Sequence, residues 1–455
     1  MNITKKISQK LLLLYLFLLP WQTLIITREI FVEDVKWQYA TMGIYITQII
    51  FWLAIIFFII SQLSYLKNRY SLHNKQIIKI FISQGFPARL LRAVLMVQAI
   101  IIFMIIRNMF SKDVFLGLQH LMYIEQGFVF VLFLLVSGIS KKQIMETILF
   151  GAIIPSLIGL LQFISQSSLS NAWLGLTEHP VLEAGSSVVV SEFSGRVLRS
   201  YATFAHPNVM GGYIAIVIMS YLFLVKGEFE KKYLSIFLLL SATLFTTFSR
   251  SAWLAVAAIL LLHLPKIHFT ERVKPLIKIF ILVFVVFSFF NKDLVQTRTH
   301  TASSKHEIAS VTERIDGVGK AITIFNKNWK YGVGAGQYTR ALQMYYPYKP
   351  IWEYQPVHSA ALLFLVEHGV VVAIMMLIFL ISVLQILEII SLQAMRDFII
   401  MLVALSPIIL FDHYVYSSYI GLMLVSLIVG IYLLQYQQQI KAILQLNTND
   451  TTEGI

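Results

Sequence analysis

Residues Asn291–Val357 read NKDLVQTRTHTASSKHEIASVTERIDGVGKAITIFNKNWKYGVGAGQYTRALQMYYPYKPIWEYQPV, the longest polar stretch in this chain. Long apolar segments lie on both sides of it. Of the 455 residues, 58% are hydrophobic and only 13% are charged, with a mean hydropathy of +0.75. A soluble globular chain carries about 25% charged residues. The composition therefore predicts an integral membrane protein with one large segment outside the bilayer.

A helix that crosses a bilayer needs about 20 apolar residues. Twelve stretches fit, so we predict an all-α integral membrane protein of about twelve transmembrane helices. The first is expected to be a retained span, because no small-residue cleavage site follows it. The predicted spans are residues 11–27, 42–66, 90–107, 114–136, 145–165, 208–225, 232–248, 251–264, 275–290, 359–389, 397–411 and 418–437.

The chain then divides into four parts. Residues 1–290 hold nine spans, residues 291–357 form an extracytoplasmic loop, residues 358–437 hold three spans, and residues 438–455 form a cytoplasmic tail.

One apolar run, residues 233–264, is too long for a single upright span. As one helix it would measure about 48 Å, whereas the hydrocarbon core of a bilayer is about 30 Å thick. Its only polar interruption is residues 246–251, which include Arg250. Two short spans that meet in a turn at Arg250 fit this pattern, and a single tilted helix is the alternative.

Lysine and arginine predict the orientation. With the N-terminus in the cytoplasm, twenty of the 36 fall in cytoplasmic segments, seven in short outer segments and nine in the long loop. Short cytoplasmic segments are normally the ones rich in positive charge, and long loops cross regardless of charge. We therefore expect both termini in the cytoplasm and residues 166–207 and 291–357 outside. The net charge of +13 is assigned to topology, and no nucleic-acid partner is expected.

The long loop has an internal pattern of its own. Ser310 and Glu313 match a capping box, which predicts that a helix begins there. An amphipathic helix of about four turns should follow and lie on the membrane surface or on the helix bundle. The glycine-rich residues 332–336 should end it. The tyrosines beyond them are either a substrate-stacking surface or an interfacial aromatic belt. The apolar positions at helical spacing are Ile315, Val318, Ala321, Ile322 and Phe325.

Three outward-facing positions could carry chemistry. Arg196 and Arg199 precede a predicted helix start at Pro207, where the helix N-terminus favours anions. Arg250 is a charge at membrane depth, which is costly and tends to be functional or paired. His358 begins the tenth predicted span. The plainer alternatives are surface arginines, a snorkelling arginine in a turn and a helix-capping histidine.

Two further patterns bear on the chemistry. Asp412 and His413 form an ionisable pair in the eleventh span, which is either a proton relay or a structural hydrogen bond. The outward acidic residues contain no Asp-x-Asp pair, and the histidines no His-x-x-x-His spacing, so no metal site is predicted. Arginines facing an anion, with a histidine nearby, suggest a leaving group that bears phosphate.

Three stretches in this order resemble the O-antigen ligase and polymerase superfamily: Arg199–Asn208 (RSYATFAHPN), Thr247–Leu254 (TFSRSAWL) and Pro356–Gly369 (PVHSAALLFLVEHG). Residues 313–336 are also similar to that family's loop before the histidine. The resemblance spans roughly residues 196–421. In two places the chain departs from the family pattern, with Ser359 where asparagine is common and Gly211-Gly212 near the Pro-Asn segment.

The resemblance implies a helical bundle of the GT-C glycosyltransferase type. It implies transfer of a glycan from a polyprenyl diphosphate, usually undecaprenyl, to a hydroxyl of a glycan or glycolipid acceptor. The transfer would take place on the outer face of the cytoplasmic membrane, with inversion and without metal or other cofactor.

By the same resemblance, Arg199 and Arg250 would bind the diphosphate, and His358 would sit at the acceptor hydroxyl. Arg196 competes with Arg199 for the donor role. The remaining substrate-binding candidates are His206, Asn208, Arg314 and Tyr338.

Three alternatives stay open at this point, one of which is a structural or signalling membrane protein. A polymerase that joins repeat units would share the same residues as a ligase. A transporter or flippase of lipid-linked glycan would place polar residues inside several spans and show related halves. The spans of this chain are mostly apolar, which favours the transferase.

Overall fold

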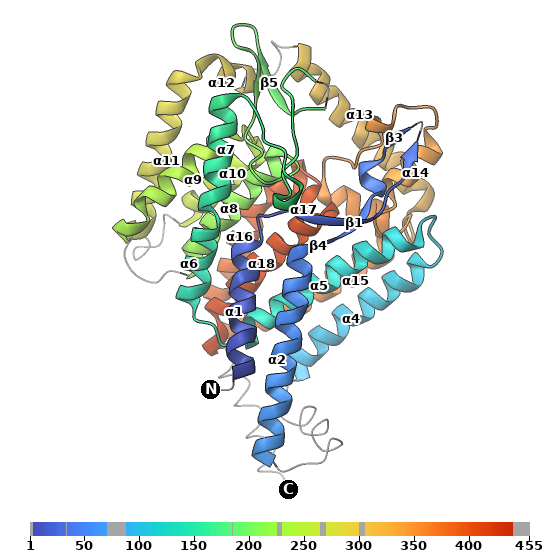
Figure 1. Cartoon of the computed structure of the whole chain (residues 1–455). Helices are drawn as coiled ribbons and strands as arrows, with labels where there is room; N and C mark the ends of the chain where they lie inside the picture. Colours follow the sequence, from blue (N-terminus) through green and yellow to red (C-terminus); the bar gives the residue numbers. More distant parts are fainter. Residues whose placement is uncertain are drawn as a thin grey trace.

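The computed structural model describes residues 3–32, 34–70, 88–183, 185–224, 230–263, 270–299 and 305–439 (Figure 1). These residues are mostly helical, which confirms the predicted helical class. The described residues also contain three two-stranded antiparallel sheets, which the sequence did not predict. All but the first two residues of the predicted tail, 438–455, lie outside the described residues.

The longer helices are α1 (Ile3–Leu18), α2 (Ile46–Tyr70), α4 (Ala88–Asn108), α5 (Val114–Val136), α6 (Lys141–Gly151), α7 (Ile153–Ser165), α8 (Pro207–Leu224), α9 (Leu234–Thr246), α10 (Arg250–His263), α11 (Thr270–Phe290), α13 (Lys305–Asn328), α15 (Ala360–Ile390), α16 (Leu392–Phe411) and α18 (Tyr419–Gln435). Shorter helices are α12 (Lys292–Thr299), α14 (Tyr338–Tyr345) and α17 (Tyr414–Ser417). The strands are β1 (Leu24–Arg28), β2 (Phe31–Val32), β3 (Val35–Lys36), β4 (Met42–Tyr45), β5 (Val188–Ser191) and β6 (Gly195–Leu198).

Six helical segments of the described chain are long and apolar enough to cross a membrane, counting α6 and α7 as one. A seventh is possible if α11 and α12, bent by 103°, form one span. The multi-pass character is thus confirmed, while the count of twelve and the GT-C arrangement stay predictions. The first predicted span, residues 11–27, is misplaced. Its helix runs from Ile3 to Leu18, because Pro20 cannot continue a helix and β1 follows.

The predicted break near Arg250 is confirmed. Helix α9 ends at Thr246 and α10 begins at Arg250, so two short helices replace one long one. Phe248 turns the chain with a φ of 47°, a conformation that is rare for a residue with a bulky side chain. Its ring is buried in a cluster with Phe245 and Leu294, and this packing holds the turn in place.

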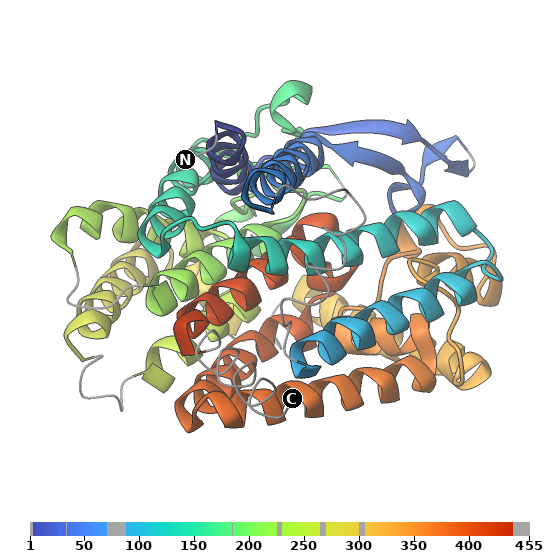
Figure 2. The same ribbon diagram turned by 90° about the horizontal axis from the view of Figure 1, so that it is seen from below.

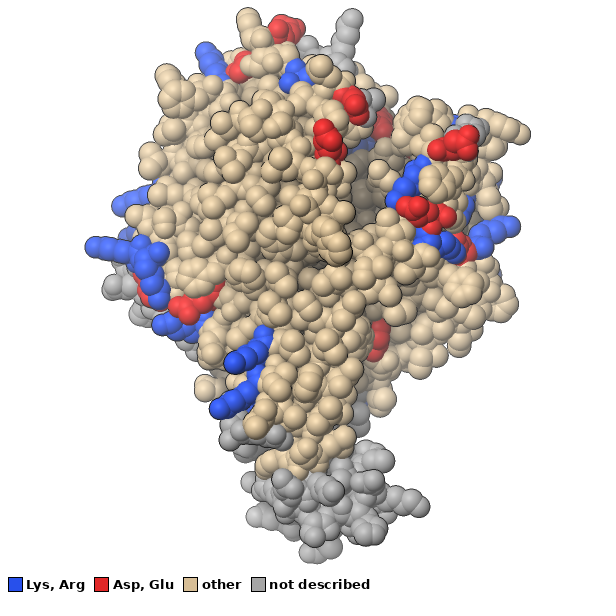
Figure 3. Space-filling model, in the orientation of Figure 1, with Lys and Arg blue, Asp and Glu red and all other residues tan. Residues whose placement is uncertain are grey.

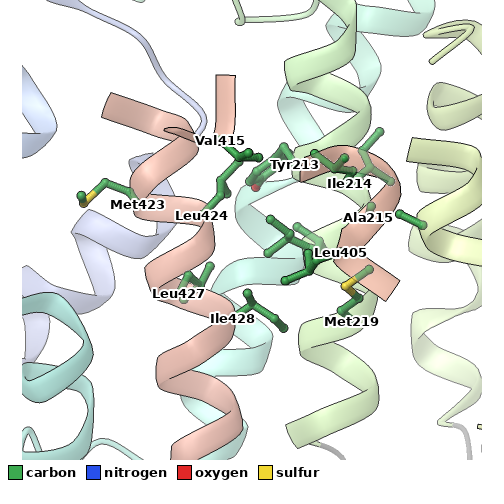
Figure 4. Close-up of a cluster of buried hydrophobic side chains, with 14 of the residues drawn as sticks. Tyr213, Ile214, Ala215, Met219, Leu405, Val415, Met423, Leu424, Leu427 and Ile428 are labelled. Carbon is green, nitrogen blue, oxygen red and sulfur yellow. The ribbon is translucent and has the colours of Figure 1, made fainter. Parts of the chain in front are cut away.

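Helix α8 lies at the centre of the helix bundle. All of its residues are buried, as expected for a helix that is apolar on every side. Figure 4 shows Tyr213 and Met219 of α8 packed against Leu405 of α16 and Leu424 of α18. Because α8 is enclosed along its whole length, the surrounding helices fix the location of Asn208 at its start.

The segments predicted to lie outside gather at one end of the molecule. In Figure 1 the sheets, α12, α13 and α14 lie away from the N-terminal end of α1. Figure 3 shows that the centre of this face is largely uncharged, whereas charged side chains lie at the top, at the right and at the left to lower left. Figure 2 shows α4 between α5 and α15, in agreement with its contacts to both helices.

The amphipathic helix of the long loop exists, but its predicted start is wrong. Helix α13 begins at Lys305, so Ser310 lies inside it and does not cap it. The preceding residues, 305–309, include good helix formers that extend the helix upstream. Ala321 and Ile324 are buried, whereas Ile315 and Ile322 of the predicted apolar stripe are exposed.

The glycine-rich segment after α13 docks on a kink in α15. Gly369 interrupts that helix with a φ of 70°. There the backbone N–H groups of Val333 and Gly334 donate to the carbonyl oxygens of Val366 and Glu367, at 3.0 and 2.9 Å. A Cβ atom on Gly369 would lie 2.5 Å from the Lys330 carbonyl oxygen. The kink therefore needs glycine for both its backbone angle and its space.

We predict that Gly369→Ala destabilises the protein by about 1–3 kcal/mol, because it adds strain and a backbone clash. Gly319→Ala is the matched control, since a Cβ there meets nothing within 4 Å and alanine favours a helix. Thermal unfolding in detergent should show a lower midpoint for the first variant only. Equal midpoints for both variants would contradict the described docking.

Candidate functional site

A cavity of about 660 Å³ lies among the segments predicted to face outward. It is lined by the β5–β6 hairpin, the starts of α8 and α10, and parts of α12 and α13. The stretch before α15 and the end of α16 complete it. Its described lining carries two acidic residues, Glu313 and Asp412, against five arginines: Arg196, Arg199, Arg250, Arg298 and Arg314. This excess of positive charge suits an anionic ligand.

Arg199 is the most firmly held of these arginines. Its side chain is buried, and Nε donates to the Thr247 carbonyl oxygen at 2.7 Å. Nη1 donates to Ser187 Oγ and Nη2 to Asn208 Oδ1, both at 2.6 Å. A guanidinium group has five N–H donors, so two remain for a ligand. The protein thus fixes the orientation of the group before any ligand binds.

Asp412 connects three helix starts beneath the cavity. Its Oδ1 accepts from Asn208 Nδ2 at 2.7 Å, and its Oδ2 accepts from Ser251 Oγ at 2.5 Å. Its backbone oxygen accepts from the N–H of Ala360 at 2.9 Å. Burial raises the pKa of Asp412, while the hydrogen bonds from Ser251 and Asn208 oppose that rise. The sequence left open a proton relay or a structural hydrogen bond at Asp412. The structure shows structural hydrogen bonds.

The other arginines reach the cavity from separate segments. Arg250 is the first residue of α10, and its Nη1 donates to the carbonyl oxygen of Arg298 at 3.3 Å. Arg314 is a half-buried residue of α13. Arg196 donates from Nε to the Val181 carbonyl at 2.7 Å and from Nη2 to the Glu183 carbonyl at 3.1 Å. Arg196 therefore orders its own loop, whereas Arg199 joins the loop to the helices.

Two histidines line the cavity and a third lies beside them. The rings of His358 and His413 are 5.5 Å apart. His206 accepts the N–H of Asn208 at Nδ1, at 3.1 Å, so a neutral His206 carries its proton on Nε2. Burial, with Arg314 nearby, lowers the pKa of His358 from 6.5 to about 4. Burial and Arg199 likewise lower the pKa of His206. Both imidazoles are therefore neutral near pH 7.

His358 also has free hydrogen-bonding capacity. Its Nδ1 is buried and makes no hydrogen bond within the described residues. No described neighbour therefore fixes the proton on that nitrogen. A neutral imidazole at a cavity wall can accept a proton from a bound hydroxyl.

The structure brings seven of the eight predicted site residues to this cavity: Arg196, Arg199, His206, Asn208, Arg250, Arg314 and His358. Tyr338 is not among its lining. That residue is buried at the start of α14, and its backbone N–H donates to Glu367. Sequence reasoning missed Ser187, Arg298 and Gln355. Only Arg298 carried a signal, as an arginine in the polar stretch.

The arrangement can bind a phosphate-bearing group and hold a neutral base beside it. Arginine guanidinium groups pair well with phosphate oxygens, and the starts of α8 and α10 add partial positive charge. Within the described residues, no group of three or more His, Asp or Glu side chains is placed to hold a metal ion.

Inorganic diphosphate is a simple probe of this cavity. A hydrogen bond to a charged group contributes about 1.5–3 kcal/mol, so Arg250→Ala should weaken diphosphate binding about 10- to 100-fold. Arg396→Ala is the control, because Arg396 is exposed on α16 and outside the cavity. Calorimetric titration of the detergent-solubilised protein measures both. Equal affinity in the two variants would place anion binding elsewhere.

Comparison with protein families gives one match. Residues 235–377 match the family model described as O-antigen ligase. This confirms the resemblance predicted from the sequence motifs. The matched residues include Arg250 and His358, whereas the motif around Arg199 precedes them. A comparison with curated protein sequences finds no match for this chain.

Proposed function

We propose that this membrane protein, of which residues 235–377 match the O-antigen ligase family model, is a metal-independent inverting glycosyltransferase of that superfamily. It moves a glycan from a polyprenyl diphosphate, of the undecaprenyl type, to a hydroxyl of a glycan or glycolipid acceptor. One observation carries the proposal: Arg199, Arg250 and His358, far apart in the sequence, line a single cavity.

The reaction takes place on the outer face of the cytoplasmic membrane, with both termini inside. The distribution of lysine and arginine supports this orientation. The clustering of the predicted outer segments around the cavity, at the end away from the start of α1, supports it as well (Figure 1). In this orientation the carrier lipid meets the cavity from the outer leaflet.

The apolar edge of the cavity supports a lipid-linked donor. Leu254 of α10 and Phe411 of α16 both line the cavity and are both more than half exposed on the molecular surface. A polyprenyl tail can therefore lie across these side chains while its diphosphate reaches the arginines. A water-soluble nucleotide sugar has no lipid tail that could contact these exposed apolar side chains.

Arg199 and Arg250 bind the diphosphate as it leaves. Negative charge grows on the leaving oxygen while the bond to the sugar carbon breaks. Groups that are already oriented stabilise this charge more in the transition state than in the ground state. The three hydrogen bonds of Arg199 provide such orientation.

The acceptor hydroxyl attacks the anomeric carbon from the side opposite the diphosphate. A new carbon–oxygen bond forms as the bond to the diphosphate oxygen breaks, which inverts the anomeric configuration. Neutral His358 takes the hydroxyl proton. The low pKa of His358 supports this role, because the imidazole is unprotonated when the acceptor binds.

Replacing Arg250 or His358 tests the assignment. Each alanine variant should lower transfer about 10²–10³-fold, while Arg396→Ala should leave it unchanged. Cells that lack the protein should accumulate full-length lipid-linked glycan, measured by mass spectrometry of extracted lipids. Arg396→Ala should clear it, and Arg250→Ala and His358→Ala should not.

Other lipid profiles have defined meanings. Accumulation of single repeat units would identify a polymerase of the same superfamily in place of a ligase. Accumulation of neither species, or clearance by both active-site variants, would contradict the proposed function.

The pH dependence of transfer tests the state of His358. Protonation removes the base, and the pKa of about 4 means that kcat/KM should fall only as the pH drops through about 4. Arg314→Gln removes a nearby positive charge, so it should move this acid limb to higher pH. A limb near pH 6.5 that Arg314→Gln does not move would contradict the assignment.

A further inference from the structure

Glu367 is a buried acid on α15, nine residues after His358, and it does not line the cavity. Its carboxylate accepts three hydrogen bonds. Oε1 accepts from the backbone N–H of Tyr338 at 3.1 Å. Oε2 accepts from the backbone N–H of Gly336 and from the hydroxyl of Tyr416, both at 2.7 Å. All three partners are donors, so the site suits a carboxylate and no other side chain of this length.

Glu367 holds one end of the segment that carries the proposed catalytic base, His358. We call this segment, residues 336–358, the first arm. From Tyr338 the chain runs through α14 to Gln355 and His358, which line the cavity. It then enters α15 and returns to Glu367. The hydrogen bonds from Gly336 and Tyr338 to Glu367 therefore tie the start of this arm to α15, the helix at its other end. Loop segments that carry functional groups need such a rigid support.

The second arm held by Glu367 leads to the floor of the cavity. Tyr416 belongs to α17, and its backbone N–H donates to the carbonyl oxygen of His413 at 3.0 Å. Asp412, which holds Asn208 and Ser251, is the preceding residue. Because Tyr416 is part of α17, its hydroxyl bond to Glu367 also fixes α17, which directly follows Asp412 and His413. We call residues 412–416 the second arm.

The neighbouring histidine completes the arrangement. The Tyr416 hydroxyl has one hydrogen, which goes to Glu367 Oε2. His368 Nε2, 2.7 Å from the same hydroxyl oxygen, must therefore be the donor of that pair. The ring of His120 packs edge-on against Tyr416 with the centroids 4.8 Å apart. Tyr416 is thus held on several sides.

We propose that Glu367 is a positioning residue that holds both arms of the cavity in register, one carrying His358 and the other Asp412. This inference rests on the proposed function for its kinetic consequence. Glu367 is not the base itself, because three donors occupy its oxygens and it does not reach the cavity lining. Its loss lets His358 drift from the acceptor hydroxyl, whereas Arg199 keeps its bonds to Thr247 and Ser187, which belong to neither arm.

Glu367→Gln and Tyr416→Phe test this role. In Glu367→Gln, the side-chain NH₂ group faces a hydrogen-bond donor and cannot accept from it. In Tyr416→Phe, the hydrogen bond from the Tyr416 hydroxyl to Glu367 is lost. Misplacement of a catalytic group by about 1 Å can cost about 100-fold in rate. Both variants should lower kcat about 10- to 100-fold, with undecaprenyl-diphosphate-linked glycan extracted from cells that lack the protein as donor. The affinity for inorganic diphosphate should stay within about twofold of the wild type. The bonds of Arg199 to Thr247 and Ser187, and of Arg250 to the Arg298 carbonyl oxygen, involve neither arm.

Asp397→Asn is the matched control. Asp397 is also a buried acid that accepts a tyrosine hydroxyl, from Tyr436 at 2.6 Å, but it lies on α16 away from the cavity. Hydrogen exchange read by mass spectrometry should speed up in peptides covering residues 333–345 and 412–418 in the two test variants only. Wild-type kcat in Glu367→Gln and Tyr416→Phe, or equal exchange in all three variants, would overturn the proposal.

The two proposals fail separately. If the wild-type protein transfers no glycan, the proposed function fails. The exchange measurement needs no substrate, so it still decides whether Glu367 fastens both arms.

Discussion

The site depends on the buried carboxylate of Asp412. It binds Asn208 at the start of α8 and Ser251 at the start of α10, and its backbone oxygen meets the start of α15. Asn208 in turn holds the guanidinium of Arg199. A buried carboxylate is costly unless its oxygens are satisfied, so the helices that satisfy it must converge. The convergence places three helix N-termini, which favour anions, around one point.

The same electrostatics serves binding and base chemistry together. Five arginines line the cavity, and this excess of positive charge attracts a diphosphate. Burial, with positive neighbours, also keeps His358 and His206 unprotonated. A buried site lined by arginines therefore presents a neutral imidazole at pH 7 beside the bound anion. Binding of the diphosphate partly neutralises the arginines, which makes His358 a better proton acceptor in the complex.

Part of this architecture follows from the sequence alone. The turn at Arg250 could be predicted because a helix over residues 233–264 would exceed the thickness of a bilayer. His358 could be placed at a helix start because apolar sequence resumes there. Both inferences depend on local composition and length. They place the residues on elements but say nothing about which elements meet.

The rest depends on contacts between distant segments. The sequence showed Asp412 as an ionisable residue, but not that Asn208 and Ser251 bind it. The role of Glu367 could not be predicted, because its partners lie in the glycine-rich segment and in α17. The start of α13 was misplaced because a capping-box pattern also occurs inside helices. The small sheets escaped prediction because their strands are too short to show alternation.

The most direct test of the central claim is a structure of the protein in a lipid nanodisc with undecaprenyl diphosphate, determined by electron cryomicroscopy. We expect density for the diphosphate within hydrogen-bonding distance of Arg199 and Arg250. We also expect the lipid tail to pass Leu254 and Phe411 into the leaflet on the side of α13. Diphosphate density away from these arginines, or a cavity that opens to the cytoplasmic leaflet, would contradict it.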